Sequence, residues 1–413
     1  MAAVATARIT RLVRAGFVIA LSGVMAFGVP GFAAADGGHS ADVPPEDVSA
    51  QSILKIVPAD SAAGDFFGAS VAVSGDIAVV GAPQDDTPAG VDSGSAYVYV
   101  RTGASWAFQA KLTPLDAAAH DNFGIAVAVY GDTVVVGANM DDVLRGSAYV
   151  FTRSGEVWSE QQKIVPASAS ANDHVGISVA LHQDTAVIGT WAEEAYVYVR
   201  SGTTWTQQSV LTDPTGAAGD FFGNAVSLYR DTAIVGATYD DAQRGSACVF
   251  TRVSTSWGFQ QKLVASDAEV SDWLGNSVSI WRDTAMVGAM GDDDGGALAG
   301  AVYVFERSGS TWTQADKLTL GAGTAAANFG SAIAIAGDTA VIGASGTDSN
   351  TGAVHVYSKV AGVWQHADEL RAADGAVTDY YGSHVSLSGG KAIIGAYADD
   401  DYGPRAGSAY SYI

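Results

Sequence analysis

One phrase of sixteen residues occurs seven times in this chain, and it constrains the fold more than any other feature. Its first copy runs from Phe67 to Ala82 and reads FGASVAVSGDIAVVGA. The glycine after the phenylalanine position recurs at intervals of 47 to 56 residues, at Gly68, Gly124, Gly176, Gly223, Gly275, Gly330 and Gly382. A repeat of this length is typical of folds in which each copy forms one supersecondary unit.

Each copy contains four short runs that read as β-strands. In the first copy they lie at 69–74, 77–82, 95–101 and 106–113, and we name them A, B, C and D in each copy. Tight turns separate A from B and C from D, as antiparallel hairpins require. The sequence therefore predicts an all-β fold, a seven-bladed β-propeller of four-stranded antiparallel blades.

Six copies begin strand D with a tryptophan, for which we predict packing between neighbouring blades. These residues are Trp106, Trp158, Trp205, Trp257, Trp312 and Trp364.

The seventh copy lacks strand D, because the chain ends after its strand C at 408–413. A strand-like run near the start, 52–57 (SILKIV), resembles the D strands of other copies and aligns Lys55 with Lys111 and Lys163. We predict that this N-terminal strand completes the last blade. Such closure would remove the unpaired strand edges that otherwise favour aggregation.

The sequence divides into three segments. Residues 1–35 read as a secretory signal peptide, with three arginines, an apolar stretch at 15–29 and alanines at 33–35. A membrane anchor is the alternative, but the stretch is short, contains Gly23 and Gly28, and is followed directly by Pro30. Residues 36–50 read as a flexible leader and 51–413 as the propeller. We therefore expect a secreted or cell-surface protein whose mature chain does not insert into a membrane.

The charge of the chain restricts its partners. With 44 acidic and 21 basic residues, the formal net charge is −23, which disfavours nucleic acid and anionic membranes. The lone cysteine, Cys248, has no internal disulfide partner, and we expect it to be a buried apolar residue. We expect a monomer that binds an extracellular protein or a glycan.

The repeat resembles the FG-GAP repeat of the integrin α-subunit propeller. The likeness rests on the Phe-Gly pair and on the run Val80-Gly81-Ala82-Pro83, and it covers residues 51–413. It is closest to a bacterial variant found in exported proteins. The resemblance implies a propeller with a role in adhesion. Integrin-type repeats often carry a calcium loop of the form D-x-D-x-D-G between strands A and B, whereas this chain has only two or three residues there and no such motif.

Acidic residues follow a geometric pattern. In a meander of four strands, the D–A and B–C loops share one face of the disc, and the A–B and C–D turns share the other. Two interpretations of the acids in these loops remain open: capping of turns, or binding of Ca²⁺, which needs six to eight oxygens from both loops. The calcium candidates are Asp60, Asp65, Asp85, Asp86, Asp116, Asp121, Asp141, Asp142, Asp240, Asp241, Asp292, Asp293, Asp399 and Asp400. Arginines at the ends of the C strands belong to the other face.

The third copy departs from the pattern. Its B–C loop is shortened to 190–194 and places Trp191 beside Glu193 and Glu194. A short loop would leave a notch in the acidic rim, so these three residues are our candidate ligand contacts. A packed tryptophan in a decayed repeat is the alternative.

Enzymatic chemistry finds little support in the sequence. The histidines show no metal-binding spacing, no G-x-S-x-G motif occurs, and the acid pairs repeat in most copies as structural residues do. We predict an exported, non-enzymatic binding or adhesion module that presents an acidic face to a protein or glycan ligand. Calcium assists this binding if the acids of the loops are calcium ligands rather than turn caps. One alternative is a lectin-like propeller, which requires exposed pockets lined by aromatics such as Trp191, Tyr239, Tyr397 and Tyr402. Another is a hydrolase or lyase, which requires one carboxylate pair with a raised pKa that other copies lack.

Overall fold

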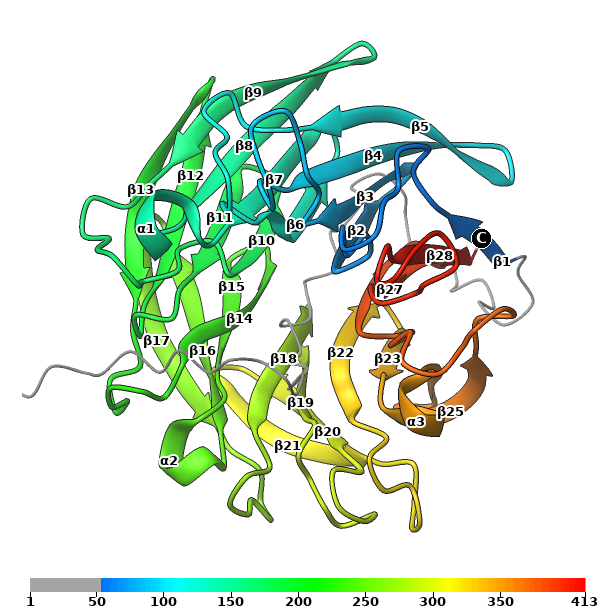
Figure 1. The fold of residues 1–413 in the computed structure, drawn as a ribbon. Helices are drawn as coiled ribbons and strands as arrows, with labels where there is room; N and C mark the ends of the chain where they lie inside the picture. Colours follow the sequence, from blue (N-terminus) through cyan, green and yellow to red (C-terminus); the bar gives the residue numbers. More distant parts are fainter. Residues whose placement is uncertain (1–52, 413) are drawn as a thin grey trace, which may run out of the picture.

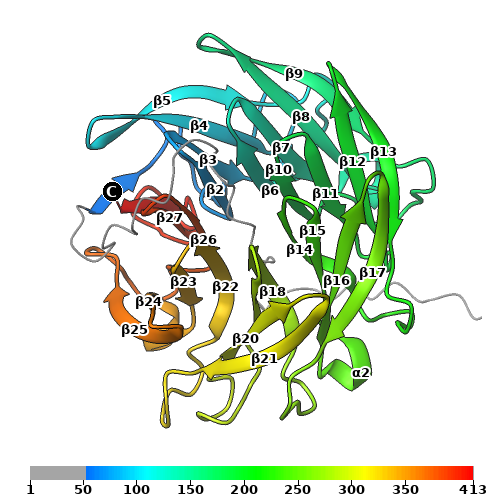
Figure 2. The same cartoon turned by 180° about the vertical axis from the view of Figure 1, so that it is seen from behind.

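The chain forms a ring of seven blades around a central axis (Figures 1 and 2). The structure, a computed structural model, describes residues 53–412. The predicted signal peptide and leader lie outside these residues. Each blade is a sheet of four antiparallel strands, so the predicted fold is confirmed.

In six blades the strands follow one another in sequence from the axis outward. The first three blades contain β2 (Ser70–Ser74), β3 (Ile77–Ala82), β4 (Ser95–Thr102) and β5 (Ser105–Leu112); β6 (Phe123–Tyr130), β7 (Thr133–Ala138), β8 (Ser147–Ser154) and β9 (Val157–Ile164); β10 (Ser178–His182), β11 (Thr185–Gly189), β12 (Ala195–Ser201) and β13 (Thr204–Leu211). The next three contain β14 (Phe222–Tyr229), β15 (Thr232–Ala237), β16 (Ser246–Val253) and β17 (Ser256–Leu263); β18 (Leu274–Trp281), β19 (Thr284–Ala289), β20 (Ala301–Ser308) and β21 (Thr311–Leu318); β22 (Phe329–Ala336), β23 (Thr339–Ala344), β24 (Ala353–Val360) and β25 (Val363–Leu370).

The seventh blade is built from both ends of the chain. It orders β26 (His384–Ser388), β27 (Lys391–Ala396), β28 (Ser408–Tyr412) and β1 (Ile53–Ile56) from the axis outward. Strand β1 pairs antiparallel with β28, and Lys55 lies opposite Tyr410 just as Lys111 lies opposite Tyr97. The predicted closure by the N-terminal strand is therefore confirmed.

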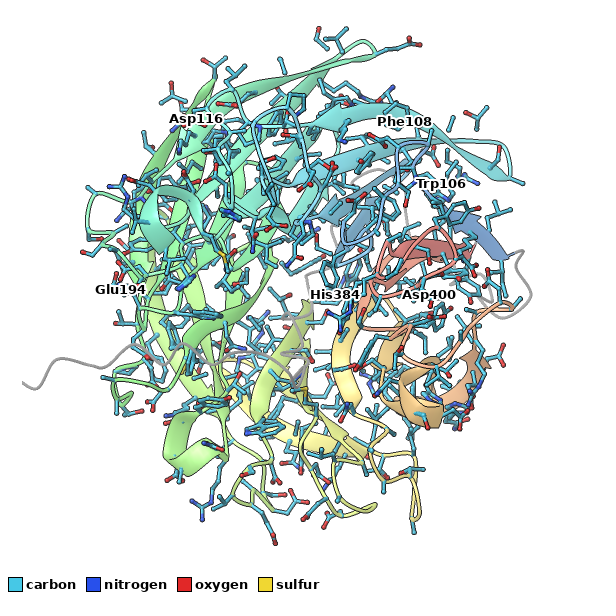
Figure 3. The ribbon with its side chains drawn as sticks, viewed as in Figure 1. Trp106, Phe108, Asp116, Glu194, His384 and Asp400 are labelled. Atoms are coloured by element: carbon cyan, nitrogen blue, oxygen red, sulfur yellow. The ribbon has the colours of Figure 1, made fainter. Side chains whose placement is uncertain are left out.

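Small side chains let the innermost strands crowd the axis. Each A strand contacts the A strands of both neighbouring blades, and β2 is buried along its whole length. Serines connect some of these strands across the blade boundary: the Val73 amide donates to Ser386 Oγ at 3.0 Å, and the Ile280 amide to Ser227 Oγ at 3.0 Å. These bonds satisfy edge N–H groups that would otherwise be unpaired inside the ring. In Figure 3, His384 of β26 lies near the axis, while Trp106 and Phe108 of β5 lie toward the rim.

The Phe-Gly pair joins successive blades. Phe67 is fully buried, and its amide donates to the carbonyl of Ala406, just before strand C of the neighbouring blade. The next residue, Gly68, has a φ of +92° and lies against the backbone of Ser408. A side chain at this glycine would collide with the neighbouring blade, so the repeated pair holds the ring together.

This packing predicts a large difference between two glycines of the second blade. Both glycines have positive φ, +98° at Gly124 and +53° at Gly131. A Cβ at Gly124 would overlap the Ser95 carbonyl oxygen, whereas a Cβ at Gly131 would meet no atom within 4 Å apart from its own chain neighbours. We expect Gly131→Ala to cost about 1 kcal/mol from backbone strain alone. Gly124→Ala should cost about 2 kcal/mol more, because the blades must move apart. Urea denaturation measures both losses of stability. Equal losses would show that the close contact at Gly124 does not join the blades.

Three B–C loops contain a short turn of unusual hand. The turns are α1 (Asp141–Leu144), α2 (Asp240–Gln243) and α3 (Thr347–Asn350). Within each, consecutive residues are left-handed, for example Asp142 at φ 49° and ψ 61° and Val143 at φ 60° and ψ 52°. Left-handed turns of non-glycine residues are costly, and a β-branched valine makes this one more so. The neighbouring loops must therefore hold them in place.

The tryptophans of the D strands pack between blades as predicted. Trp205 and Trp312 are each only 2% exposed, and the indole N–H of Trp205 donates to Gln161 of the preceding blade at 3.0 Å. Cys248 is fully buried, which raises the pKa of its thiol, as expected for an apolar core residue. Within residues 53–412, no helix has the length and apolar character needed to cross a membrane.

Candidate functional site

The D–A and B–C loops lie together on one side of the ring, which we call the loop face. The Gln84 amide of a B–C loop donates to the Asp65 carbonyl of a D–A loop at 3.3 Å, and Lys111 contacts acids of both loops. These contacts confirm the predicted sharing of one face. The A–B and C–D turns lie on the opposite side, which we call the turn face.

A lysine ammonium sits between the acids of the two loops in five blades. Each lysine comes from strand D, and each bridges one acid of the D–A loop and the first acid of the B–C pair. The clusters are Lys55 with Asp374, Asp399 and Asp401; Lys111 with Asp60 and Asp85; Lys163 with Asp116 and Asp141; Lys262 with Asp213 and Asp240; and Lys317 with Asp267, Asp292 and Asp294.

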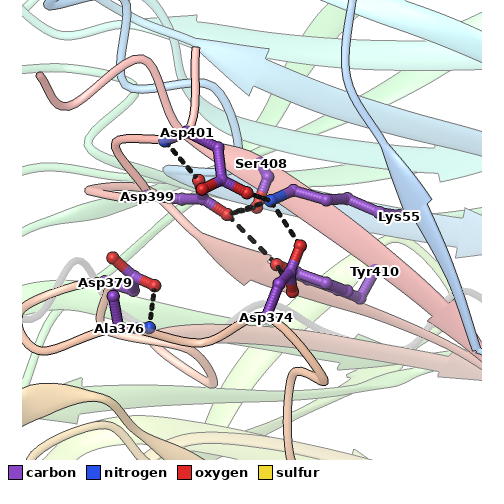
Figure 4. Close-up of polar contacts among 8 residues, drawn as sticks. All are labelled: Lys55, Asp374, Ala376, Asp379, Asp399, Asp401, Ser408 and Tyr410. Carbon is purple, nitrogen blue, oxygen red and sulfur yellow. Dashed lines mark hydrogen bonds and ion pairs between the residues drawn. The ribbon is translucent and has the colours of Figure 1, made fainter. Parts of the chain in front are cut away.

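Figure 4 shows the cluster of the seventh blade. Lys55 Nζ lies 2.8 Å from Asp374, 2.7 Å from Asp399 and 2.6 Å from Asp401. Burial alone would lower the pKa of Lys55, but the bonds to these three carboxylates outweigh it and raise the pKa above its usual value. The lysine stays charged and ties the two loops to the outer strand.

A second group of acids caps the D–A loops. Asp65 accepts the amide of Ala62 at 2.7 Å, and Asp121 accepts that of Ala118 at 2.7 Å. The same bond, from the residue three positions earlier, recurs at Asp173, Asp220, Asp272 and Asp379. These carboxylates are therefore parts of the loop scaffold.

Burial raises the pKa of Asp65, Asp272 and Asp379 to about 6, and that of Asp121 in the same direction. The shift recurs at equivalent positions of four blades, so no single blade has a distinctive acid. A raised pKa that recurs in several blades is expected of carboxylates with a structural role. The hydrolase alternative required one pair of carboxylates whose raised pKa is absent from the other blades.

The raised values predict a pH dependence of stability. Between about pH 4 and pH 6 the folded state binds more protons at these positions than the unfolded state, so the free energy of unfolding should fall as pH rises through this window. Asp272→Asn removes the ionisation and keeps an oxygen for the Glu269 amide. We expect its stability to decline less than that of the wild type between pH 4 and pH 6 in urea titrations. Parallel profiles would contradict the assignment.

The calcium candidates thus fall into three environments. Asp60, Asp85, Asp116, Asp141, Asp240, Asp292 and Asp399 contact lysine, and Asp65 and Asp121 cap backbone amides. Asp86, Asp142, Asp241, Asp293 and Asp400 are exposed. Of these, Asp142 pairs with Arg145, Asp241 pairs with Arg244 at 3.6 Å, and Asp86 accepts the amide of Asp92 at 2.9 Å. Among the residues from 53 to 412, no group of three or more His, Cys, Asp or Glu side chains is arranged to hold a metal ion. Calcium binding stays a prediction.

The shortened loop of the third blade is held by Glu193. In the other six blades, carbonyls of the B–C loop accept the amides that precede the next A strand, as in the bonds from Asn122 to Asp92 and from Phe123 to Ser93. The third blade lacks those residues. Instead, the Glu193 carboxylate accepts the amides of Gly219 at 2.8 Å, Phe221 at 3.3 Å and Phe222 at 3.1 Å. Glu194 accepts the hydroxyl of Tyr196.

An aromatic row crosses the loop face at this short loop. Trp191 is 38% exposed, and its ring lies 4.3 Å from that of His174 and 5.8 Å from that of Phe221. Tyr239 continues the row, 4.8 Å from Phe221. Both His174 and Phe221 have positive φ, 51° and 57°, which aromatic residues rarely adopt. Of the three predicted ligand contacts, only Trp191 is exposed, because Glu193 and Glu194 are half-buried and bonded to backbone amides and to Tyr196.

The turn face carries a different pairing. An arginine at the end of each of five C strands binds an aspartate of the A–B turn, as in Arg101 with Asp76 at 2.7 Å and Arg252 with Asp231 at 2.6 Å. Thus each face has its own repeated ion pair.

Comparison with known families rests on the same repeats. The FG-GAP repeat matches seven segments, at 51–99, 106–151, 158–203, 205–250, 257–305, 312–357 and 364–412. The chain belongs to the FG-GAP repeat family. No curated protein matches it. Each FG-GAP segment runs from a D strand to the following C strand, so the family repeat is offset by one strand from the blade. This offset is why the first segment supplies the last strand of the seventh blade.

Membership in the FG-GAP family indicates a class of function. FG-GAP propellers are typically binding or adhesion modules without enzymatic activity, and FG-GAP repeats are typical of extracellular proteins. The loop face described above is the candidate site for such binding.

Proposed function

We propose that this FG-GAP propeller is an exported, non-enzymatic module that binds an extracellular protein through its loop face. One observation carries the proposal: five blades place an exposed carboxylate at the same position on that face, at Asp86, Asp142, Asp241, Asp293 and Asp400. The scaffold beneath them is already tied by lysines and backbone caps. Exposed carboxylates on a rigid ring favour a partner with basic side chains.

The test uses an array of extracellular matrix proteins, probed at low and high salt. We expect binding to basic proteins that weakens as salt rises. The triple variant Asp142→Asn, Asp241→Asn, Asp293→Asn should lose affinity and most of its salt dependence. Phe108→Ala, an exposed aromatic on strand β5 at 58% exposure, is the matched control and should bind as wild type does. Equal binding by the triple variant would reject the proposal.

A second candidate is glycan binding, favoured by the exposed ring of Trp191. Its test is a glycan array with Trp191→Ala, which should abolish glycan signals and leave basic-protein signals intact. Repeating both arrays with Ca²⁺ and with a chelator tests calcium assistance. Comparing the culture medium of cells that express chains with and without residues 1–35 tests export.

A further inference from the structure

The sixth blade carries a histidine and a glutamate where other blades build a lysine cluster. In the first blade, Lys111 of β5 lies opposite Tyr97 of β4. At the same two positions of the sixth blade, Glu369 of β25 lies opposite His355 of β24. The other six blades have a tyrosine or a cysteine where His355 lies, at Tyr97, Tyr149, Tyr196, Cys248, Tyr303 and Tyr410. The sixth blade therefore breaks the symmetry of the ring with residue types that ligate metals.

Two imidazole rings face each other across the β24–β25 hairpin. His355 Nδ1 lies 3.1 Å from His366 Nε2, and the two ring centroids are 5.3 Å apart. His355 is only 5% exposed and its ring packs against Phe329, whereas His366 is exposed to solvent. The core thus fixes one imidazole, and the other can be reached from solution. The two histidines are 11 positions apart in the sequence, which is why no local spacing motif marks them.

The separation of the two nitrogens suits a shared metal ion. At the usual zinc–nitrogen distance of about 2.0–2.1 Å, nitrogens 3.1 Å apart subtend an angle of about 100° at the metal. This angle lies between the square-planar geometry typical of copper and the tetrahedral geometry typical of zinc. Each neutral imidazole can direct a lone pair at the metal and keep its proton on the other ring nitrogen. Binding therefore replaces only the hydrogen bond between the rings.

The charge around the pair favours a cation. Glu369 places a carboxylate opposite His355, where five other blades place the ammonium group of a lysine that would repel a metal ion. Arg371 lies 2.5 Å from Glu369 and 2.5 Å from Asp348, so two carboxylates outweigh its single positive charge. A metal ion at the histidines would therefore have net negative charge beside it.

We propose that His355 and His366 bind one divalent transition-metal ion, zinc or copper, with water in the remaining coordination positions. Imidazole is a preferred ligand of both metals. Two side chains and water suffice for this site, so it does not need the group of three or more ligating residues that the described part of the chain lacks. The metal ion links β24 to β25 in a blade without a lysine cluster. The exposed aspartates of the loop face take no part in it, so either proposal can fail without the other.

Equilibrium dialysis of the full chain against Zn²⁺ and against Cu²⁺ tests the site. We expect one ion per chain at the histidine pair, and excess Ca²⁺ should not displace it, because calcium prefers oxygen ligands. His355→Tyr and His366→Gln copy Tyr303 and Gln314 of the fifth blade, so both variants should fold. Each should bind at least about tenfold more weakly, since loss of even an outer partner of a metal ligand costs that much. His120→Gln removes another exposed histidine, on the loop face, and should bind as the wild type does.

Two further measurements separate a metal site from a hydrogen-bonded pair of histidines. Zinc should raise the melting temperature of the wild type and of His120→Gln, but not that of His366→Gln, because only a ligand bound to the folded state stabilises it. The electron paramagnetic resonance spectrum of the copper form should show coupling to two nitrogens, which His366→Gln reduces. The proposal is overturned if the wild type binds neither ion, or if His355→Tyr and His366→Gln bind both as tightly as the wild type.

Discussion

A chain that begins at residue 58 is expected to lose its stable ring, whereas a chain that begins at residue 51 should melt like one that begins at residue 36. Removing β1 exposes the whole edge of β28, uncovers the core around Ile56 and takes Lys55 from three carboxylates. We expect the melting temperature to fall by about 10 °C or more. Thermal unfolding followed by circular dichroism measures it.

Adding the missing strand back tests whether its absence causes the loss of stability. A peptide of residues 51–57 added to the shortened chain should restore part of the melting temperature, because it can pair with β28 again. If the chains beginning at 51 and 58 melt together, the shared blade does not hold the ring.

Lys317→Met is the second change with a large expected effect. The ammonium of Lys317 lies 2.8 Å from Asp267, 2.8 Å from Asp292 and 2.6 Å from Asp294, and the Asp292 side chain is only 4% exposed. Removal of the cation leaves a buried carboxylate beside two others. Breaking one partner of such a pair costs about 3 kcal/mol. Urea denaturation at neutral pH measures the loss.

Two controls separate this effect from general charge changes. The double variant Lys317→Met, Asp292→Asn should be more stable than the sum of its single variants predicts, because the uncompensated charge is gone. Arg145→Met breaks an exposed pair with Asp142 and should cost less than about 1 kcal/mol. A similar loss in Lys317→Met and Arg145→Met would show that the lysine clusters contribute little.

Much of the fold could be predicted from the sequence because the repeat supplies seven copies of each signal. Strand periodicity, the Gly-Asp turns and the strand count determine the blades, and the alignment of Lys55 with Lys111 predicts the closure. The two faces follow from strand direction alone. Local rules and global architecture agree at these positions.

The environments of the acids could not be predicted with the same success, because they depend on contacts between loops. A signal was nevertheless present. Strand D carries the lysine in the five blades that have an aspartate near the start of the D–A loop as well as one in the B–C loop. The third and sixth blades lack that first aspartate and carry Val210 and Glu369 in place of the lysine. That covariation points to internal ion pairs. The bonds of Glu193 leave no comparable trace, because a side chain there replaces backbone carbonyls that other copies supply.

The turns α1, α2 and α3 also could not be predicted from the sequence. Nothing in Asp142 and Val143 favours consecutive left-handed residues, and the loop adopts them because its ends bond to the next D–A loop through Leu144 and Arg145.

The pairing of β1 with β28 has a mechanical consequence. Ile53, at the start of β1, lies opposite Tyr412, at the end of β28, so both ends of the pair meet at one corner of the blade. Tension applied between the two chain ends would load the backbone hydrogen bonds one after another, starting at that corner. Tension applied from the N-terminal side to the opposite side of the disc would load the whole pair along its length. The β1–β28 pair would then separate at low force when the chain ends are pulled apart and would resist a pull across the disc. The point of attachment would therefore decide whether the ring opens under load.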